Sequence, residues 1–200
     1  MVDISTTPPP NYIAVNGTKY ETHTDFRIWR DIIVTAQENL YDAPETDEEI
    51  LNNWETLAEL QRKAFSRVLK ESAVDVFNAM LEFAKGYPKE SSGYSQDEDG
   101  DGKKIFSLKH DMNYIIIAIR NQSGIDLSYN RIEPFHWWLF MLEFQTLNDT
   151  HLITQMMRWR SYDGKDKEMI RLRSRVALPE EYTKGELKLL DQIDEMFPNA

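Results

Sequence analysis

The chain has 200 residues, no cysteine and a formal net charge of −11 at pH 7. Absence of cysteine excludes disulfides, thiolate metal ligands and a cysteine nucleophile. The acidic balance argues against nucleic acid and anionic membranes as partners, because surfaces that bind phosphates are rich in Lys and Arg. Residues 1–11 lack a signal-peptide pattern, and no apolar run approaches the roughly 20 residues that span a bilayer. We therefore expect a cytosolic protein.

The N-terminal segment predicts a small β-hairpin. Residues 1–11, with a run of three prolines, are expected to be a flexible lead-in. Asn16-Gly17 then separates Tyr12-Ile-Ala-Val15 from Thr18-Lys-Tyr-Glu21, two short runs typical of strands. Because Asn and Gly tolerate positive φ, this pair favours a type I′ turn between antiparallel strands.

Three helices are expected next. The first begins at Thr24 as N-cap and fades near Leu40. Thr46 and Glu49 form a capping box that starts the second, which is expected to run towards Lys70. The third begins near Ser72 and ends before Gly86 and Pro88. Their expected apolar stripes, by residue spacing, are Phe26, Trp29, Ile32, Ile33 and Ala36; Ile50, Trp54, Leu57, Ala64, Phe65 and Val68; and Phe77, Met80, Leu81 and Ala84.

A polar, acidic stretch at about 87–104 predicts a mobile loop. A helix is expected between Asp111 as N-cap and Gly124 as the residue after its end, although Tyr114-Ile-Ile-Ile-Ala-Ile119 has the composition of a strand. The segment 134–147 is apolar nearly all round and predicts a helix buried in the domain or in an interface. Trp137, Trp138 or both should therefore be buried.

The last third of the chain predicts three more helices. One starts at Asp149 or Thr150, and a basic one runs from about 166 to 178 and stops at Pro179. A second capping box, Thr183-Lys-Gly-Glu186, starts the last. We therefore expect a mainly α protein of about seven or eight helices with an N-terminal hairpin. Residues 12–179 would form a single helical domain, and residues 180–200 an appended C-terminal helix.

The acidic loop contains an incomplete calcium-binding pattern. Asp97, Asp99, Asp101 and Gly102 have the spacing of an EF-hand loop, but the twelfth position, which needs a bidentate Glu, is Leu108. An ordinary acidic loop is the favoured interpretation, so we expect no metal site.

No catalytic constellation stands out. The four histidines (His23, His110, His136 and His151) include no His-x-x-x-His pair. The glycine-rich phosphate loop and the serine-hydrolase elbow are absent as well. We expect neither enzymatic activity nor a cofactor.

Charge is distributed unevenly along the chain. Residues 41–61 hold seven acidic side chains and no basic one, whereas residues 158–175 hold seven basic side chains against three acidic ones. Two interpretations stay open: two solvated helical faces, which is the favoured one, or two poles that bind partners, including each other in an oligomer.

Several motifs, in order, resemble those of a phage protein family. They are Thr24-Asp-Phe-Arg27, Gly124-Ile-Asp-Leu127, His136-Trp-Trp138 and Met157-x-x-Arg160 followed by Lys165-Asp-Lys-Glu168. Together they resemble the "gene product fifteen" family of tailed phages and prophages of Gram-positive bacteria, over roughly residues 12–179.

The resemblance implies a non-enzymatic tail assembly chaperone in the host bacterial cytoplasm, because the family's gene usually lies just before that of the tape-measure protein. The implied partners are the tape-measure protein and, secondarily, the major tail protein, with a homo-oligomer left open. The alternative is a structural virion component such as a tail completion protein. Methionine and aromatic side chains beside the basic segment suggest the partner surface, with these candidate residues: Met156, Met157, Arg158, Trp159, Arg160, Arg171 and Arg175. The favoured alternative is that these methionine and tryptophan residues only complete the core.

Overall fold

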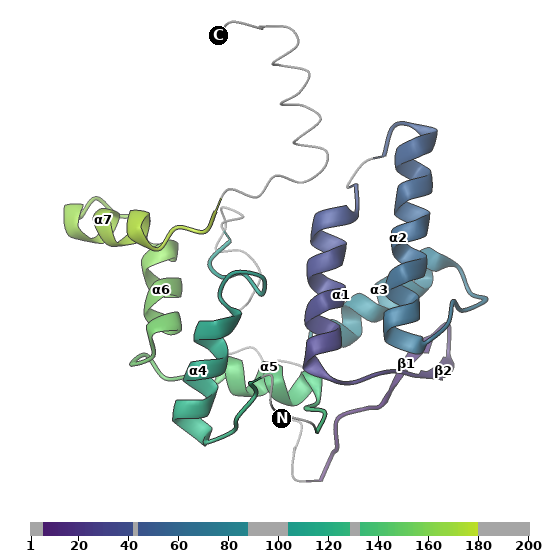
Figure 1. Ribbon diagram of the computed structural model, residues 1–200, viewed down its shortest axis with the longest axis horizontal. Helices are drawn as coiled ribbons and strands as arrows, with labels where there is room; N and C mark the ends of the chain where they lie inside the picture. Colours follow the sequence, from purple (N-terminus) through teal and green to yellow (C-terminus); the bar gives the residue numbers. More distant parts are fainter. Residues whose placement is uncertain (1–5, 42–43, 88–103, 129–132, 180–200) are drawn as a thin grey trace, which may run out of the picture. The chain divides into compact units, whose positions relative to one another are not determined.

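The computed structural model describes residues 6–41, 44–87, 104–128 and 133–179. Over these residues it contains seven helices and one two-stranded sheet, which confirms a mainly α fold with an N-terminal hairpin (Figure 1). The chain divides into two compact units, here called the N-terminal unit (residues 10–85) and the C-terminal unit (residues 86–179, with residues 6–9). The expected extent of a single domain, 12–179, stays a prediction.

The hairpin forms at the predicted residues. Strands β1 (Tyr12–Val15) and β2 (Thr18–Glu21) are antiparallel, with Val15 opposite Thr18 beside the turn. Asn16 and Gly17 have φ values of 49° and 82°, as a type I′ turn requires. Ile13 and Val15 are both buried and lie on one side of β1, which faces α3.

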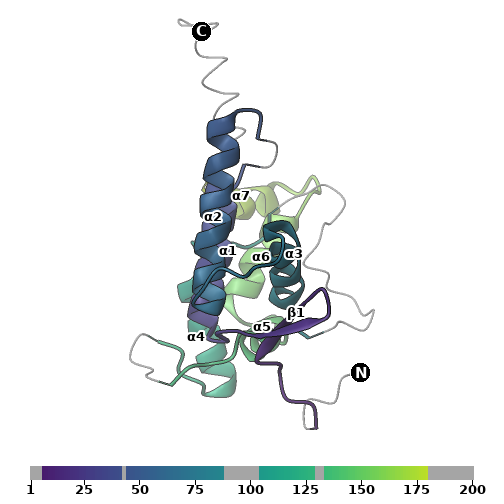
Figure 2. The ribbon, with the colours of Figure 1, turned by 90° about the vertical axis from the view of Figure 1, so that its right-hand side faces the viewer.

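Helix α1 (Phe26–Asn39) packs lengthwise against α2 (Asp47–Phe65); the two lie side by side in Figure 1, and α2 lies in front of α1 in Figure 2. The N-cap of α1 is Asp25 rather than the predicted Thr24, and its carboxylate accepts a hydrogen bond from the backbone N–H of Arg27. A carboxylate beside the helix start also complements the helix dipole. The buried residues of α1 are Phe26, Trp29 and Ile32, all from the predicted stripe.

The capping box of α2 is confirmed, because Thr46 and Glu49 bond to each other's backbone N–H groups. The predicted stripe is right for Ala64 and Phe65, which are buried, and wrong for Ile50, Trp54 and Val68, which are exposed. The helix also ends at Phe65, since Ser66 adopts a left-handed φ of 58°. The prediction towards Lys70 was therefore too long.

The exposure of Ile50 follows from the relative lengths of α1 and α2. The side-chain amide of Asn52 donates to the backbone carbonyl of Asn39, the last residue of α1. Residues 47–51 of α2 therefore extend past the end of α1 (Figure 1). Trp54 lies further along α2 but is turned away from Leu60 and Ala64, which are fully buried.

Helix α3 (Ala73–Ala84) completes the N-terminal unit and packs on β1 and α2 (Figure 2). Its buried residues are Val76, Met80 and Phe83, so the predicted stripe is right for Met80 but wrong for Leu81, which is exposed. Phe83 contacts the ring of Trp29 with centroids 4.6 Å apart. Gly86 follows the helix with a φ of 78°, in agreement with the predicted end.

The C-terminal unit contains α4 (Met112–Ser123), α5 (Trp137–Gln145), α6 (Leu152–Ser161) and α7 (Lys167–Arg175). Helix α4 contacts both α5 and α6, and α7 contacts α6. The choice of helix for α4 is confirmed, with Gly124 left-handed at its end. Helix α5 is shorter than the predicted segment.

The apolar centre of this unit agrees with the sequence. Trp137 is 1% exposed and Phe140 is fully buried, which confirms the expectation for the two tryptophans; Trp138 is half-buried. The imidazole Nδ1 of His136 accepts a hydrogen bond from the backbone N–H of Trp138 and so caps α5. The N-cap of α6 is His151, not Asp149 or Thr150 as predicted.

The incomplete calcium pattern at 97–102 and the predicted helix at 180–200 lie outside the described residues, as does most of the acidic loop. Among the helices that are described, none has the length and apolar character needed to cross a membrane.

Candidate partner surface

A buried ion pair positions α6 within the C-terminal unit. Arg160, 5% exposed, bonds both carboxylate oxygens of Asp111 at 2.6 and 3.0 Å. Its remaining donors reach the backbone carbonyls of Ile105 (3.1 Å) and Val176 (2.6 Å). One guanidinium therefore joins the start of α4, the segment before it and the end of α7.

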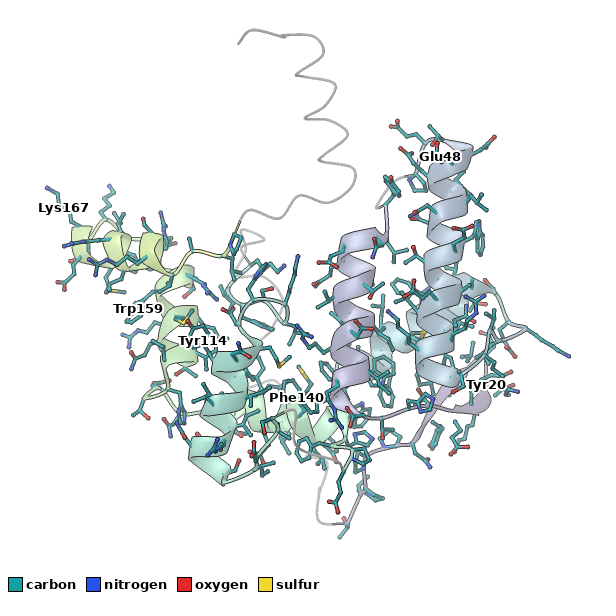
Figure 3. All side chains as sticks on the ribbon, in the orientation of Figure 1. Tyr20, Glu48, Tyr114, Phe140, Trp159 and Lys167 are labelled. Carbon is teal, nitrogen blue, oxygen red and sulfur yellow. The ribbon has the colours of Figure 1, made fainter. Side chains whose placement is uncertain are left out.

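This geometry divides the candidate residues of α6 between core and surface. Arg160 and Met156 are buried, whereas Met157 and Trp159 are half-buried and Arg158 is exposed. In the folded unit, only these last three α6 candidates present side-chain surface to solvent. Trp159 and Tyr114 come from the neighbouring helices α6 and α4 (Figure 3).

Helix α7 is an amphipathic helix without a buried residue. Its N-cap Asp166 accepts hydrogen bonds from the N–H groups of Glu168 and Met169, and Arg173 donates to the carbonyl of Tyr162. None of its nine residues is buried, although those on the inward side are half-buried. The half-buried residues are Met169, Leu172 and Arg173, and the exposed ones are Lys167, Glu168, Ile170, Arg171, Ser174 and Arg175.

Five of the seven candidate residues lie at or near the surface of the adjacent helices α6 and α7: Met157, Arg158, Trp159, Arg171 and Arg175. We name this set the α6–α7 surface. This set contains three exposed guanidinium groups, on Arg158, Arg171 and Arg175, and two half-buried apolar side chains, on Met157 and Trp159.

A second exposed face was missed by the sequence reasoning. Helix α2 presents Ile50, Leu51 and Trp54 to solvent, and Trp54 also lines a shallow hollow with Glu55, Ala58, Glu59 and Arg62. Helical spacing alone assigned Ile50 and Trp54 to the core. The signal that could have found this face is the run of seven acidic residues without a basic one over 41–61.

Three histidines, His23, His136 and His151, make hydrogen bonds within the fold. The imidazole of His23 lies 2.7 Å from the hydroxyl of Ser66, and that of His151 lies 3.2 Å from the side-chain oxygen of Gln122. His136 caps α5. Over the described ranges, no three His, Asp or Glu side chains gather as a metal site would require.

Comparison with known protein families matched the chain to the family described as "Bacteriophage Gp15 protein", over residues 9–183. Comparisons with curated proteins and with solved structures gave no match. The matched range spans both compact units, from β1 to beyond α7. The chain therefore belongs to the bacteriophage Gp15 protein family.

Proposed function

We propose that this protein is a non-enzymatic tail assembly chaperone that binds the tape-measure protein in the host cytoplasm and assists assembly of the tail tube. The observation that carries the proposal is helix α7, an amphipathic helix without a buried residue that packs on α6, which carries the exposed Arg158. Membership of a bacteriophage family supports the phage context.

The physical reason for this proposal lies in the form of the tape-measure protein. A tape-measure protein is a long helix, and it exposes apolar stripes until the tube encloses it. A chaperone needs a surface with apolar anchors at helical spacing and polar groups beside them. Met157 and Trp159 supply adaptable apolar surface, while Arg158, Arg171 and Arg175 can pair with acidic side chains that flank the stripe.

Co-expression tests this function. The cognate tape-measure fragment is produced alone and together with this protein, and its soluble fraction is measured. We expect the fragment to aggregate alone and to be recovered in a soluble complex when the protein is present. A fragment that stays insoluble and uncomplexed in the presence of the wild-type chain would contradict the proposal.

A structural virion component, such as a tail completion protein, is separated by a different measurement. A chaperone acts before the tail is finished, so mass spectrometry of purified particles should not recover it in stoichiometric amounts. Stoichiometric recovery from mature particles would instead support the structural role. The major tail protein is the second partner to test in the same co-expression assay.

A further inference from the structure

The exposed face of α2 has a defined chemical pattern. Leu51, Trp54 and Ala58 follow one another along one side of the helix at three- and four-residue spacing, and Leu51 and Trp54 are 59% and 50% exposed. Glu48 and Glu55 run along one flank of this stripe. We name this the α2 face. Contiguous exposed apolar side chains can mark a docking surface, and tryptophan is enriched among the residues that carry most of the binding energy of interfaces.

The outward side of α7 carries the complementary pattern. Lys167, Arg171 and Arg175 are all exposed and are spaced four residues apart, with Ile170 exposed beside them. At 1.5 Å per residue, the three basic residues span about 12 Å along the helix, and Glu48 and Glu55 span about 10 Å along α2. Glu48 and Lys167 lie near the starts of their helices (Figure 3).

We propose that the α2 face of one copy of this chain binds the outward side of α7 of a second copy. Leu51 and Trp54 would pack against Ile170, and Glu48 and Glu55 would pair with the basic row of α7. Each chain carries both surfaces, so a dimer that closes makes the contact twice, whereas a contact that does not close links further copies. A doubled contact matters because one helix pair buries little area for a stable interface. This inference does not rest on the chaperone function, but both use Arg171 and Arg175, so a second copy and the tape-measure protein would compete for these residues.

Charge distinguishes two candidate occupants of the α2 face, namely residues 180–200 of the same chain and α7 of a second copy. The chain's own residues 180–200 carry an apolar helical pattern, but they contain six acidic residues and only two basic ones. Placing them against Glu48 and Glu55 would bring like charges together, which costs free energy. Helix α7, with four basic residues and one acidic residue, has the opposite sign.

The test is the oligomeric state of the full-length chain, measured by light scattering and sedimentation at low salt. We expect self-association that weakens as ionic strength rises to about 0.5 M, because salt screens charge pairs near the surface. A wild-type chain that stays monomeric at every concentration would overturn the proposal, and this is also the outcome if α7 met the α2 face within one chain.

Charge reversal then identifies the surfaces. Glu48→Lys with Glu55→Lys, or Lys167→Glu with Arg171→Glu, should each weaken association about tenfold or more, because like charges would face one another. Glu21→Lys with Asp149→Lys changes the net charge by the same amount as the α2 pair, at exposed positions elsewhere, and should leave association unchanged. If the Glu48/Glu55 pair and the Glu21/Asp149 control pair weaken association equally, net charge, and not this contact, governs association.

Mixing the two reversed variants gives the sharpest result. In the mixture, the unaltered α7 of one variant can meet the unaltered α2 of the other, and the two reversed surfaces also attract. Association should therefore return in the mixture and in a chain that carries all four substitutions. Misfolding could not produce such a rescue. Failure of the rescue between variants whose circular dichroism matches that of the wild type would overturn the contact.

Trp54→Ala tests the apolar part of the same surface. Trp54 is half exposed in one chain, so its truncation should weaken association while leaving the secondary structure intact. Leu152→Ala on α6 removes another exposed apolar side chain and should leave association unchanged. If both substitutions have the same effect, the α2 face is not the docking surface.

Discussion

Arg160 and Asp111 form a bidentate ion pair in which the guanidinium and the carboxylate are both almost completely buried. Asp111 occupies the N-cap position of α4 but makes no capping bond. Its carboxylate is instead engaged by Arg160 and by the backbone N–H of Ser107. The pair therefore fixes the relative positions of α4 and α6, on which the α6–α7 surface depends.

Removal of one partner of this pair should be costly. We expect Arg160→Met to lower the free energy of unfolding by about 3–5 kcal/mol, because Asp111 would be left as a buried, uncompensated charge. Urea unfolding of the full chain, followed by circular dichroism, measures this. The double variant Arg160→Met with Asp111→Leu should recover a large part of the loss, and a double variant less stable than the single one would contradict this explanation.

The tryptophans should differ sharply in their contributions to stability. Trp137, 1% exposed, packs against Phe140 with ring centroids 5.5 Å apart, so Trp137→Ala should cost about 3–5 kcal/mol. Trp54→Ala at the exposed position is the matched control and should change stability by about 0.5 kcal/mol or less under conditions where the chain is monomeric. Similar losses for the two variants in urea unfolding would show that Trp54 is part of the core.

Helix capping offers a second matched comparison. Thr46 accepts a hydrogen bond from the backbone N–H of Glu49, so Thr46→Ala should cost about 1 kcal/mol. Ser72 occupies the N-cap position of α3 without a side-chain capping bond, so Ser72→Ala should cost less. Thermal unfolding of the two variants measures both losses of stability. The reverse order would mean that the capping box does not stabilise α2.

Stability should also respond to acid through Glu71. The hydroxyl of Tyr20 donates a hydrogen bond to the carboxylate of Glu71, and this bond lowers the pKa of Glu71 below its ordinary value of 4.5. A carboxyl with a lowered pKa contributes stability above its unfolded pKa and loses it as the pH falls through the folded value. The loss is therefore expected below about pH 4.5, in the range typical of unfolded glutamate.

Tyr20→Phe removes this bond, so the pKa of Glu71 should rise towards its ordinary value and the acid-dependent loss should become smaller. An NMR titration of the Glu71 carboxyl in both proteins measures the pKa directly. Identical titrations would show that Tyr20 does not stabilise the charged form of Glu71.

Local signals in the sequence predicted most of the fold. The Asn16-Gly17 turn, the Thr46 capping box and the left-handed Gly124 each depend on residues close in sequence, and all three are confirmed. The errors arose where tertiary contacts decide. Ile50 has the right spacing for a buried stripe, but α2 extends past α1 at that point, and helical periodicity carries no information on where a neighbouring helix ends.

The candidate surface was predictable only in part. Composition located the basic segment, and Arg158, Arg171 and Arg175 are indeed exposed. Arg160 is buried with its partner Asp111, which lies 49 residues away in the sequence. Sequence spacing gives no signal across such a separation. Arginines two residues apart on one helix point in different directions, and only the packing of α6 on α4 decides which one is buried.

The most direct measurement is the affinity of the purified chain for the cognate tape-measure fragment, compared between two charge-reversed variants. Arg158→Glu with Arg171→Glu alters the α6–α7 surface. Lys70→Glu with Arg120→Glu makes the same change in net charge at exposed positions elsewhere. We predict a complex with the wild type, weakened about tenfold or more by the first pair and unchanged by the second. Absence of a wild-type complex would contradict the chaperone function, and equal binding by both variants would contradict the assigned surface.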